Sequence, residues 1–186
     1  MPSLATTTSI SDDHVAGGRV DRWRVGPFAH TLIAQLLAAG ERQPGAERIA
    51  RAANQLRLLG EVGAYRVAVK QRVVSAVALY FRLFLPTVEW TFNDSDVSSR
   101  SERFYLVWRS AAGTLVDELK AGPVGTQLER KALCEEARRE ATAGRSKFGQ
   151  EFLGLRVVIL GAPRWSFLAG VDGREVAIEW EGSDER

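Results

Sequence analysis

The chain has 186 residues, of which 45% are hydrophobic and 26% are charged, and its formal net charge is +2. These values are typical of a soluble globular protein with one domain of ordinary size. A net charge this small does not by itself indicate a nucleic-acid partner. The basic residues of the first 75 positions and the acidic residues of positions 172–186 permit a polyanionic partner without requiring one.

The chain has one cysteine, Cys134, and two histidines, His14 and His30. A single cysteine cannot form an intrachain disulfide, which favours a reducing, cytoplasmic compartment. The absence of a Cys/His cluster excludes a structural zinc site. The N-terminus lacks the continuous apolar stretch of a secretion signal, and no apolar stretch of the sequence has the length of a membrane span. We therefore expect a soluble, cytoplasmic protein without a membrane partner.

The first 60 residues are predicted to precede the main domain. Residues 1–18 are rich in Ser, Thr, Asp and Gly, and residues 1–26 are expected to form a disordered or extended leader. Residues 27–60 are expected to form a helical extension, with one helix over Phe28–Ala39 opened by Pro27 and a second over Ala46–Leu59. Such a pair resembles a helix-turn-helix, but structural packing is the preferred interpretation.

The main domain is expected over residues 61–182, followed by an acidic tail at 183–186. It begins with a helix over Ala64–Leu85, which is apolar nearly all round near its end and should therefore be buried. Pro86 ends this helix.

Three antiparallel strands are predicted next, at Thr87–Phe92, Arg103–Arg109 and Thr114–Lys120, with a polar loop over residues 93–101. A helix follows from about Thr126 to Ala143, and residues 144–154 are expected to be irregular. The continuous apolar run Leu155–Leu160 is typical of a central strand. A terminal hairpin is expected around residues 171–173, with Arg174–Trp180 as a last edge strand. The predicted fold class is α+β with a mixed sheet.

The most informative stretch is the predicted strand that contains Glu118 and Lys120. Residues two apart in a strand lie on the same face, so a carboxylate and an ammonium would lie side by side. This arrangement can hold a divalent metal next to an activated water. Asp117 would lie on the opposite face between two core leucines, where it requires a hydrogen-bond partner.

A helix over residues 114–121 is the alternative interpretation of the same stretch. Thr114 and Asp117 have the spacing of a capping box, and Leu115 and Leu119 lie four residues apart, as on one face of a helix. Gly122 and the proline after it would then end the helix.

The order of these elements, with Glu118-Leu-Lys120 closing the third strand, resembles the PD-(D/E)XK nuclease superfamily, and the RecB-type and restriction-type members in particular. The resemblance covers about residues 61 to 160. It implies a restriction-endonuclease-like core in which a helix packs on an antiparallel meander and the last meander strand carries the acid-X-Lys motif. It also implies a site glutamine at the start of the next helix, where Gln127 stands, and an acid on the first helix, where Glu61 is the candidate.

The second strand departs from the pattern of this superfamily, which has an aspartate where this chain has Tyr105. A neutral phenol cannot supply the missing carboxylate, and one carboxylate alone holds Mg²⁺ poorly. Asp94, Asp96 or Glu102 from the preceding loop would have to replace it, and Asp96 is the first choice. The expected metal ligands are therefore Asp96 and Glu118, with Mg²⁺ or Mn²⁺ as the cofactor.

The resemblance implies hydrolysis of phosphodiester bonds in DNA, in defence, repair or mobile-element processing, with Glu118, Lys120 and Gln127 as the catalytic residues. The alternative is a catalytically inactive nuclease-fold module that binds DNA or assembles with a protein partner, and Tyr105 favours it. A third interpretation is an unrelated α+β binding protein, in which residues 114–121 form a helix. Coordinates for this stretch separate the third interpretation from the other two.

Overall fold

Strand β3 occupies the middle of a five-stranded sheet. The computed structural model describes residues 13–55, 64–98, 103–122 and 126–171. In chain order its elements are α1 (Asp13–Ala38), α2 (Ala46–Gln55), α3 (Ala64–Leu83), β1 (Thr91–Ser98), β2 (Arg103–Ser110), β3 (Gly113–Lys120), α4 (Gln127–Phe148), β4 (Phe152–Ile159), the short 3₁₀ helix η1 (Pro163–Trp165) and β5 (Phe167–Gly170). Helices followed by a mixed sheet make this an α+β fold, as the sequence predicts.

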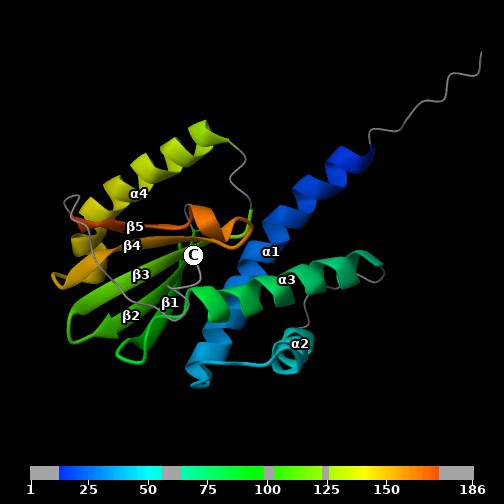
Figure 1. Cartoon of the computed structure of the whole chain (residues 1–186), viewed down its shortest axis with the longest axis horizontal. Coiled ribbons are helices and arrows are strands. Elements are labelled where there is room, and N and C mark those ends of the chain that lie inside the picture. Colours follow the sequence, from blue (N-terminus) through cyan, green and yellow to red (C-terminus); the bar gives the residue numbers. More distant parts are fainter. Residues whose placement is uncertain (1–12, 56–63, 99–102, 123–125, 172–186) are drawn as a thin grey trace, which may run out of the picture.

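The strands lie in the sheet in the order β1-β2-β3-β4-β5. The first three form an antiparallel meander, β4 is parallel to β3, and β5 is antiparallel to β4. The parallel pair requires a crossover connection, because two parallel strands cannot be joined by a tight turn. Helix α4 is that crossover, and it packs against β4 and β5 (Figure 1).

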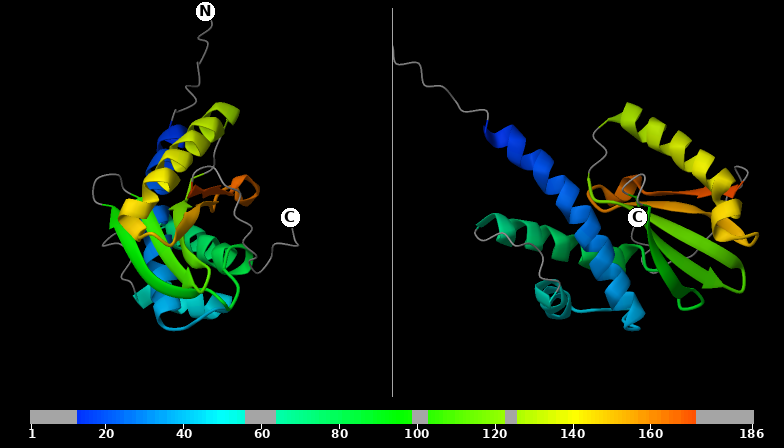
Figure 2. Two further views of the ribbon diagram at one scale, coloured as in Figure 1. Left: turned by 90° about the vertical axis from the view of Figure 1, so that its left-hand side faces the viewer. Right: turned by 180° about the vertical axis from the view of Figure 1, so that it is seen from behind.

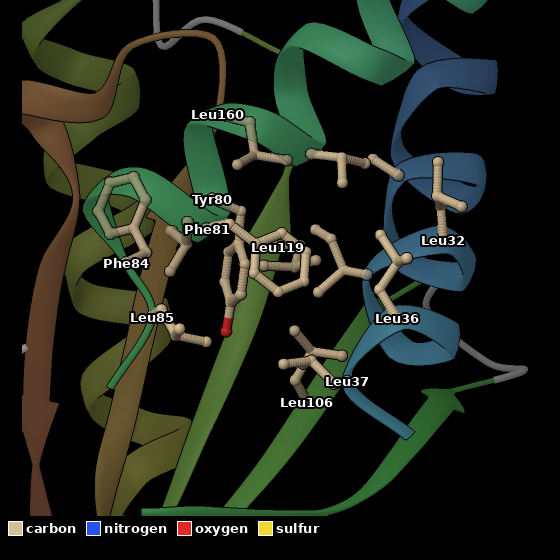
Figure 3. Close-up of a cluster of buried hydrophobic side chains, with 14 of the residues drawn as sticks. Leu32, Leu36, Leu37, Tyr80, Phe81, Phe84, Leu85, Leu106, Leu119 and Leu160 are labelled. Carbon is tan, nitrogen blue, oxygen red and sulfur yellow. The ribbon is translucent and has the colours of Figure 1, made fainter. Parts of the chain in front are cut away.

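Helices cover both faces of the sheet. Helices α1 and α3 pack on one face, while α4 covers the other (Figure 2). The core under α1 and α3 is drawn in Figure 3 and includes Leu32 and Leu36 from α1, Tyr80 from α3, Phe84 just after α3, and Leu119 from β3. The second core lies between α4 and the sheet. Because both faces are covered, seven of the eight residues of β3 are buried.

The expected start of the first helix at Pro27 is wrong. Helix α1 begins at Asp13 and contains Pro27 in its interior, so it includes residues 13–26 of the expected leader. A proline inside a helix removes one backbone hydrogen bond, which favours a helix start there when the sequence is considered alone. Val25 and Ala29, on either side of Pro27, are both buried in the core. The burial of residues on both sides of the proline therefore outweighs the lost hydrogen bond, and the helix continues past Pro27.

The next two helices agree with the prediction within the described residues. Helix α2 begins at Ala46 and buries Ile49 and Ala53, as expected. The predicted continuation of this helix over residues 56–59 lies outside the described residues, as does Glu61. Near the end of α3, Val77, Tyr80 and Phe81 are buried, while Arg82 is exposed.

The predicted first strand was displaced along the chain. Strand β1 covers Thr91–Ser98 and so includes most of the expected polar loop, while Val88, expected to lie in the strand, is 77% exposed. The pairing of β1 with β2 contains an irregularity between Phe92 and Asp94. An edge strand has only one neighbour and can carry polar residues, so β1 lacks the apolar alternation that the prediction used.

Helix α4 is longer than predicted, and only three residues separate it from β4. Its start is fixed by a capping box in which Thr126 and Glu129 bond to each other's backbone N–H groups. Gly144 was predicted to end it but instead lies buried inside it, where a Cβ atom would fall 2.1 Å from a ring carbon of Phe152. This glycine allows close packing. The expectation of irregular structure over residues 144–154 therefore holds only for residues 149–151.

The last strands were predicted less well. The strand expected at Leu155–Leu160 corresponds to β4, which starts earlier, at Phe152, and ends at Ile159. Strand β5 at Phe167–Gly170 lies where the first strand of the expected terminal hairpin would be, but its bounds were not predicted, because its four residues are too few to show a period. The predicted strand over residues 174–180 and the tail at 183–186 lie outside the described residues.

Candidate functional site

Strand β3 separates its charged residues between the two faces of the sheet. Asp117 lies on the face under α1 and α3, while Glu118 and Lys120 lie on the face under α4. The strand prediction for residues 114–120 is thus confirmed, and the alternative helix over the same residues is excluded.

Glu118 and Lys120 form an ion pair. The Nζ atom of Lys120 lies 2.6 Å from Oε1 of Glu118, and the side chains are 32% and 2% exposed, respectively. The carboxylate is therefore buried behind the ammonium group, which still reaches solvent. A carboxylate is a group that binds hard cations, and an ammonium group is one that binds anions.

Tyr105 of β2 lies directly opposite Glu118 in the sheet. Its side chain is buried, and its hydroxyl donates a hydrogen bond of 3.4 Å to Oε2 of Glu140 on α4. Lys147, also on α4, places Nζ 4.2 Å from the centre of the Tyr105 ring, within the range of a cation–π interaction. A phenol, held by α4, therefore occupies the position where the superfamily pattern has an aspartate.

Glu140 was missed by sequence reasoning. Its contact with Tyr105 links residues 35 positions apart. The available signal was the helical period, since Glu140, Gly144 and Lys147 fall at spacings that share one face of a helix.

Asp96 lies directly opposite Tyr105 on β1, so the backbone register aligns Asp96, Tyr105 and Glu118 in one row across three strands. Adjacent strands lie about 4.8 Å apart, which puts Asp96 and Glu118 about 10 Å apart at the backbone. The side chains of Asp94 and Asp96 lie outside the described part of the chain, and so does Glu102. Within the described residues, no group of three possible metal ligands occurs.

Gln127 is the first residue of α4, and its side chain is exposed. The contacts of α4 with Tyr105 come from Glu140 and Lys147. Glu140, the nearer of these two residues, lies 13 residues after Gln127, which corresponds to about 20 Å of helix. The described contacts therefore connect Tyr105 with the second half of α4 and not with the start of the helix.

On the opposite face, Asp117 is the centre of a buried hydrogen-bond cluster. Its carboxylate accepts hydrogen bonds from the Tyr80 hydroxyl at 2.6 Å and from the Trp108 indole N–H at 3.1 Å. Arg156 of β4 donates from Nε to Oδ1 at 2.7 Å and from Nη2 to Oδ2 at 2.6 Å. The hydrogen-bond partners that this buried carboxylate requires are therefore present, because the fold brings α3, β2 and β4 to it.

The protonation of this cluster follows from its burial. Burial raises the pKa of the Tyr80 hydroxyl well above its ordinary value, and the nearby negative charge of Asp117 raises it further. Burial acts to lower the pKa of Arg156, but the Asp117 carboxylate outweighs this effect, so that the pKa is raised. The cluster is thus a neutral phenol beside a carboxylate–guanidinium pair.

His30 connects α1 to the same part of β2. Its ring is buried, and Nε2 lies 2.9 Å from the backbone carbonyl oxygen of Tyr105. A carbonyl oxygen only accepts hydrogen bonds, so Nε2 carries the proton and donates. The backbone of Tyr105 is therefore held by α1, while its side chain is held by α4.

Among the described residues, no helix is both long enough and apolar enough to cross a membrane. Comparison of the chain with models of protein families, with curated protein sequences and with solved structures gives no match.

Proposed function

We propose that this protein is a metal-dependent phosphodiesterase that cleaves DNA, with a core of the PD-(D/E)XK nuclease type. The observation that carries the proposal is the position of Glu118 and Lys120 on one face at the end of the third meander strand. The order of helix α3, strands β1 to β3, helix α4 and parallel strand β4 supports it, because this order is the one that the resemblance implies.

In this proposal Glu118 and Asp96 hold Mg²⁺ or Mn²⁺. The bound ion supplies a Lewis acid that polarises the phosphate. The donor set fits in part, since Glu118 supplies a buried carboxylate and Asp96 lies in the same cross-strand row, with Tyr105 between them. The ammonium group of Lys120 orients the attacking water and stabilises the negative charge that develops on the phosphate oxygens.

A catalytically silent nuclease-fold module, used to bind DNA or to assemble with a protein partner, is the second candidate. The specific observation in its favour is Tyr105, whose buried phenol lies directly opposite Glu118 and bonds to Glu140. The Lys120 ammonium also already neutralises the one described carboxylate of the row. A protein of this kind would bind DNA without cleaving it.

The experiment is a cleavage assay on single- and double-stranded DNA and on RNA, with Mg²⁺ or Mn²⁺. Wild type is compared with Glu118→Gln and Lys120→Met, which keep the size of each side chain and remove its charge. We expect each change to lower the cleavage rate by about 100-fold or more, because a preorganised charge at the reacting group contributes on that scale. Circular dichroism checks that both variants fold.

The matched controls are Glu135→Gln and Lys131→Met. These residues form an ion pair of the same kind on the exposed side of α4, with a distance of 4.0 Å and side chains 57% and 77% exposed. Both controls should cleave at the wild-type rate. Equal loss in controls and test variants would show that general charge, and not the β3 pair, matters. If wild type cleaves no substrate but binds DNA, the second candidate replaces the first.

A further inference from the structure

The hydrophobic pattern of strand β4 carries almost no information about the alignment of this strand with β3. Its sequence, Phe152–Ile159, is apolar except for Arg156, and seven of its eight residues are buried. A strand that is polar on one face and apolar on the other fixes its own register, because a shift by one residue would expose the apolar face. A strand that is apolar on both faces lacks this constraint.

Arg156 is the exception, and it lies directly opposite Asp117 in the pairing of β3 with β4. The guanidinium group donates two hydrogen bonds to the carboxylate and a third, of 2.5 Å, from Nη2 to the backbone carbonyl oxygen of Phe84 near the end of α3. The side chains of Arg156 and Asp117 are 1% and 0% exposed. The pair thus joins two strands and a helix at one point of the core.

A shift of β4 by two residues would keep its apolar residues on the same faces but would separate this pair. Arg156 would then lie opposite Leu115 or Leu119, which now face Gly154 and Val158. A guanidinium buried without its carboxylate is strongly disfavoured. The hydrophobic pattern of β4 does not oppose such a shift, whereas the ion pair does.

We infer that the buried Asp117–Arg156 pair is a register lock, which selects one alignment of β4 with β3 and thereby positions the end of β3 that carries Lys120. The connection to Lys120 is direct, since the N–H of Leu160, just after β4, donates to the Lys120 carbonyl oxygen at 2.8 Å. The inference does not depend on the proposed function, and its test needs no cleavage. Asp117 and Arg156 are positioning residues, as they lie on the face opposite Glu118.

The test replaces both partners by apolar residues of similar size, Asp117→Leu with Arg156→Met, in the full chain. Nuclear Overhauser contacts between β3 and β4 then report the register, which in the wild type pairs Glu118 with Val157. We expect the double variant to stay folded, because a buried ion pair adds little net stability over a well-packed apolar pair. We also expect more than one set of β3 and β4 resonances, with contacts from shifted pairings.

A single set of resonances with the wild-type contact between Glu118 and Val157 would overturn the inference. The double variant Lys131→Met with Glu135→Leu, which removes the exposed ion pair of α4, should keep one set. If the core double variant does not fold, hydrogen exchange in Asp117→Asn decides. A lock predicts exchange about tenfold faster at β4 amides, with the amide of Val107 unchanged, since this residue of β2 faces the other core. Equal acceleration on both strands would overturn the inference.

Discussion

Replacement of Arg156 by methionine tests the buried cluster most simply. The change keeps much of the side-chain volume but leaves the Asp117 carboxylate buried without its cation. Only the hydrogen bonds from Tyr80 and Trp108 would remain to that carboxylate. The Phe84 carbonyl would also lose the hydrogen bond that it accepts from Arg156.

The expected loss in the free energy of unfolding is about 3–5 kcal/mol, the cost of removing one partner from a buried pair. A domain of this size has a total stability of about 5–15 kcal/mol, so Arg156→Met should remove a large part of it. Arg48→Met is the matched control. Arg48 is paired with Glu41 at 2.5 Å, but their side chains are 39% and 26% exposed. An exposed pair contributes at most about 1 kcal/mol.

Urea unfolding followed by circular dichroism measures both variants against the wild type. The expected order of stability is wild type, then Arg48→Met close below it, then Arg156→Met far below. The reasoning would be refuted if Arg156→Met lowered the free energy of unfolding by less than about 1 kcal/mol, or by no more than the control does. Either result would show that the buried Asp117 carboxylate does not depend on Arg156.

Two further predictions concern Tyr80 and Gly144. Burial raises the Tyr80 pKa, so the folded state favours the neutral phenol. The stability that this neutral phenol contributes to the fold is fully present below about pH 10 and is lost as the pH rises through the raised pKa. Tyr80→Phe should therefore cost about 1–3 kcal/mol at pH 7 and less at pH 11; a constant difference in urea unfolding would contradict this. Gly144→Ala should destabilise the fold by about 1–3 kcal/mol and lower the melting temperature, because the added methyl group overpacks against Phe152. The control Ala143→Ser, on the exposed side of α4, should leave the melting temperature unchanged. An unchanged melting temperature for Gly144→Ala would contradict the close contact.

The sequence was sufficient to predict β3 and the faces of its charged residues, because the alternation of a strand is a local property. It was also sufficient to predict that Asp117 needs partners. It could not identify them, since Tyr80 and Arg156 lie 37 and 39 residues away along the chain. Such contacts are set by the packing of α3 and β4 on the sheet.

The errors at element boundaries have a similar origin. Pro27 and Gly144 are residues that usually interrupt helices, and both lie inside one here. In each case packing overrides the local preference, since Val25 and Ala29 are buried around the proline and the glycine allows Phe152 to approach. A single sequence shows the preference but not the neighbour that overrides it.

For the candidate site, the sequence was sufficient to predict that Glu118 and Lys120 lie together, and the register confirms that Tyr105 lies opposite Glu118. The contact between Tyr105 and Glu140 depends on where α4 crosses the sheet. That crossing position is a tertiary property, which local periodicity does not contain.

The most direct test of the proposed site restores the carboxylate that the superfamily pattern has at position 105. Manganese binding is measured by isothermal titration calorimetry for the wild type, Tyr105→Asp, the uncharged control Tyr105→Asn, and Tyr105→Asp combined with Glu118→Gln. Directly opposed side chains on neighbouring strands have Cβ atoms about 5 Å apart, close enough for two carboxylates to share a cation. The account predicts that Tyr105→Asp binds Mn²⁺ more tightly than the wild type and the asparagine control, and that Glu118→Gln abolishes the gain. Equal binding by the aspartate and asparagine variants, with both folded, would contradict the placement of a metal site at Glu118.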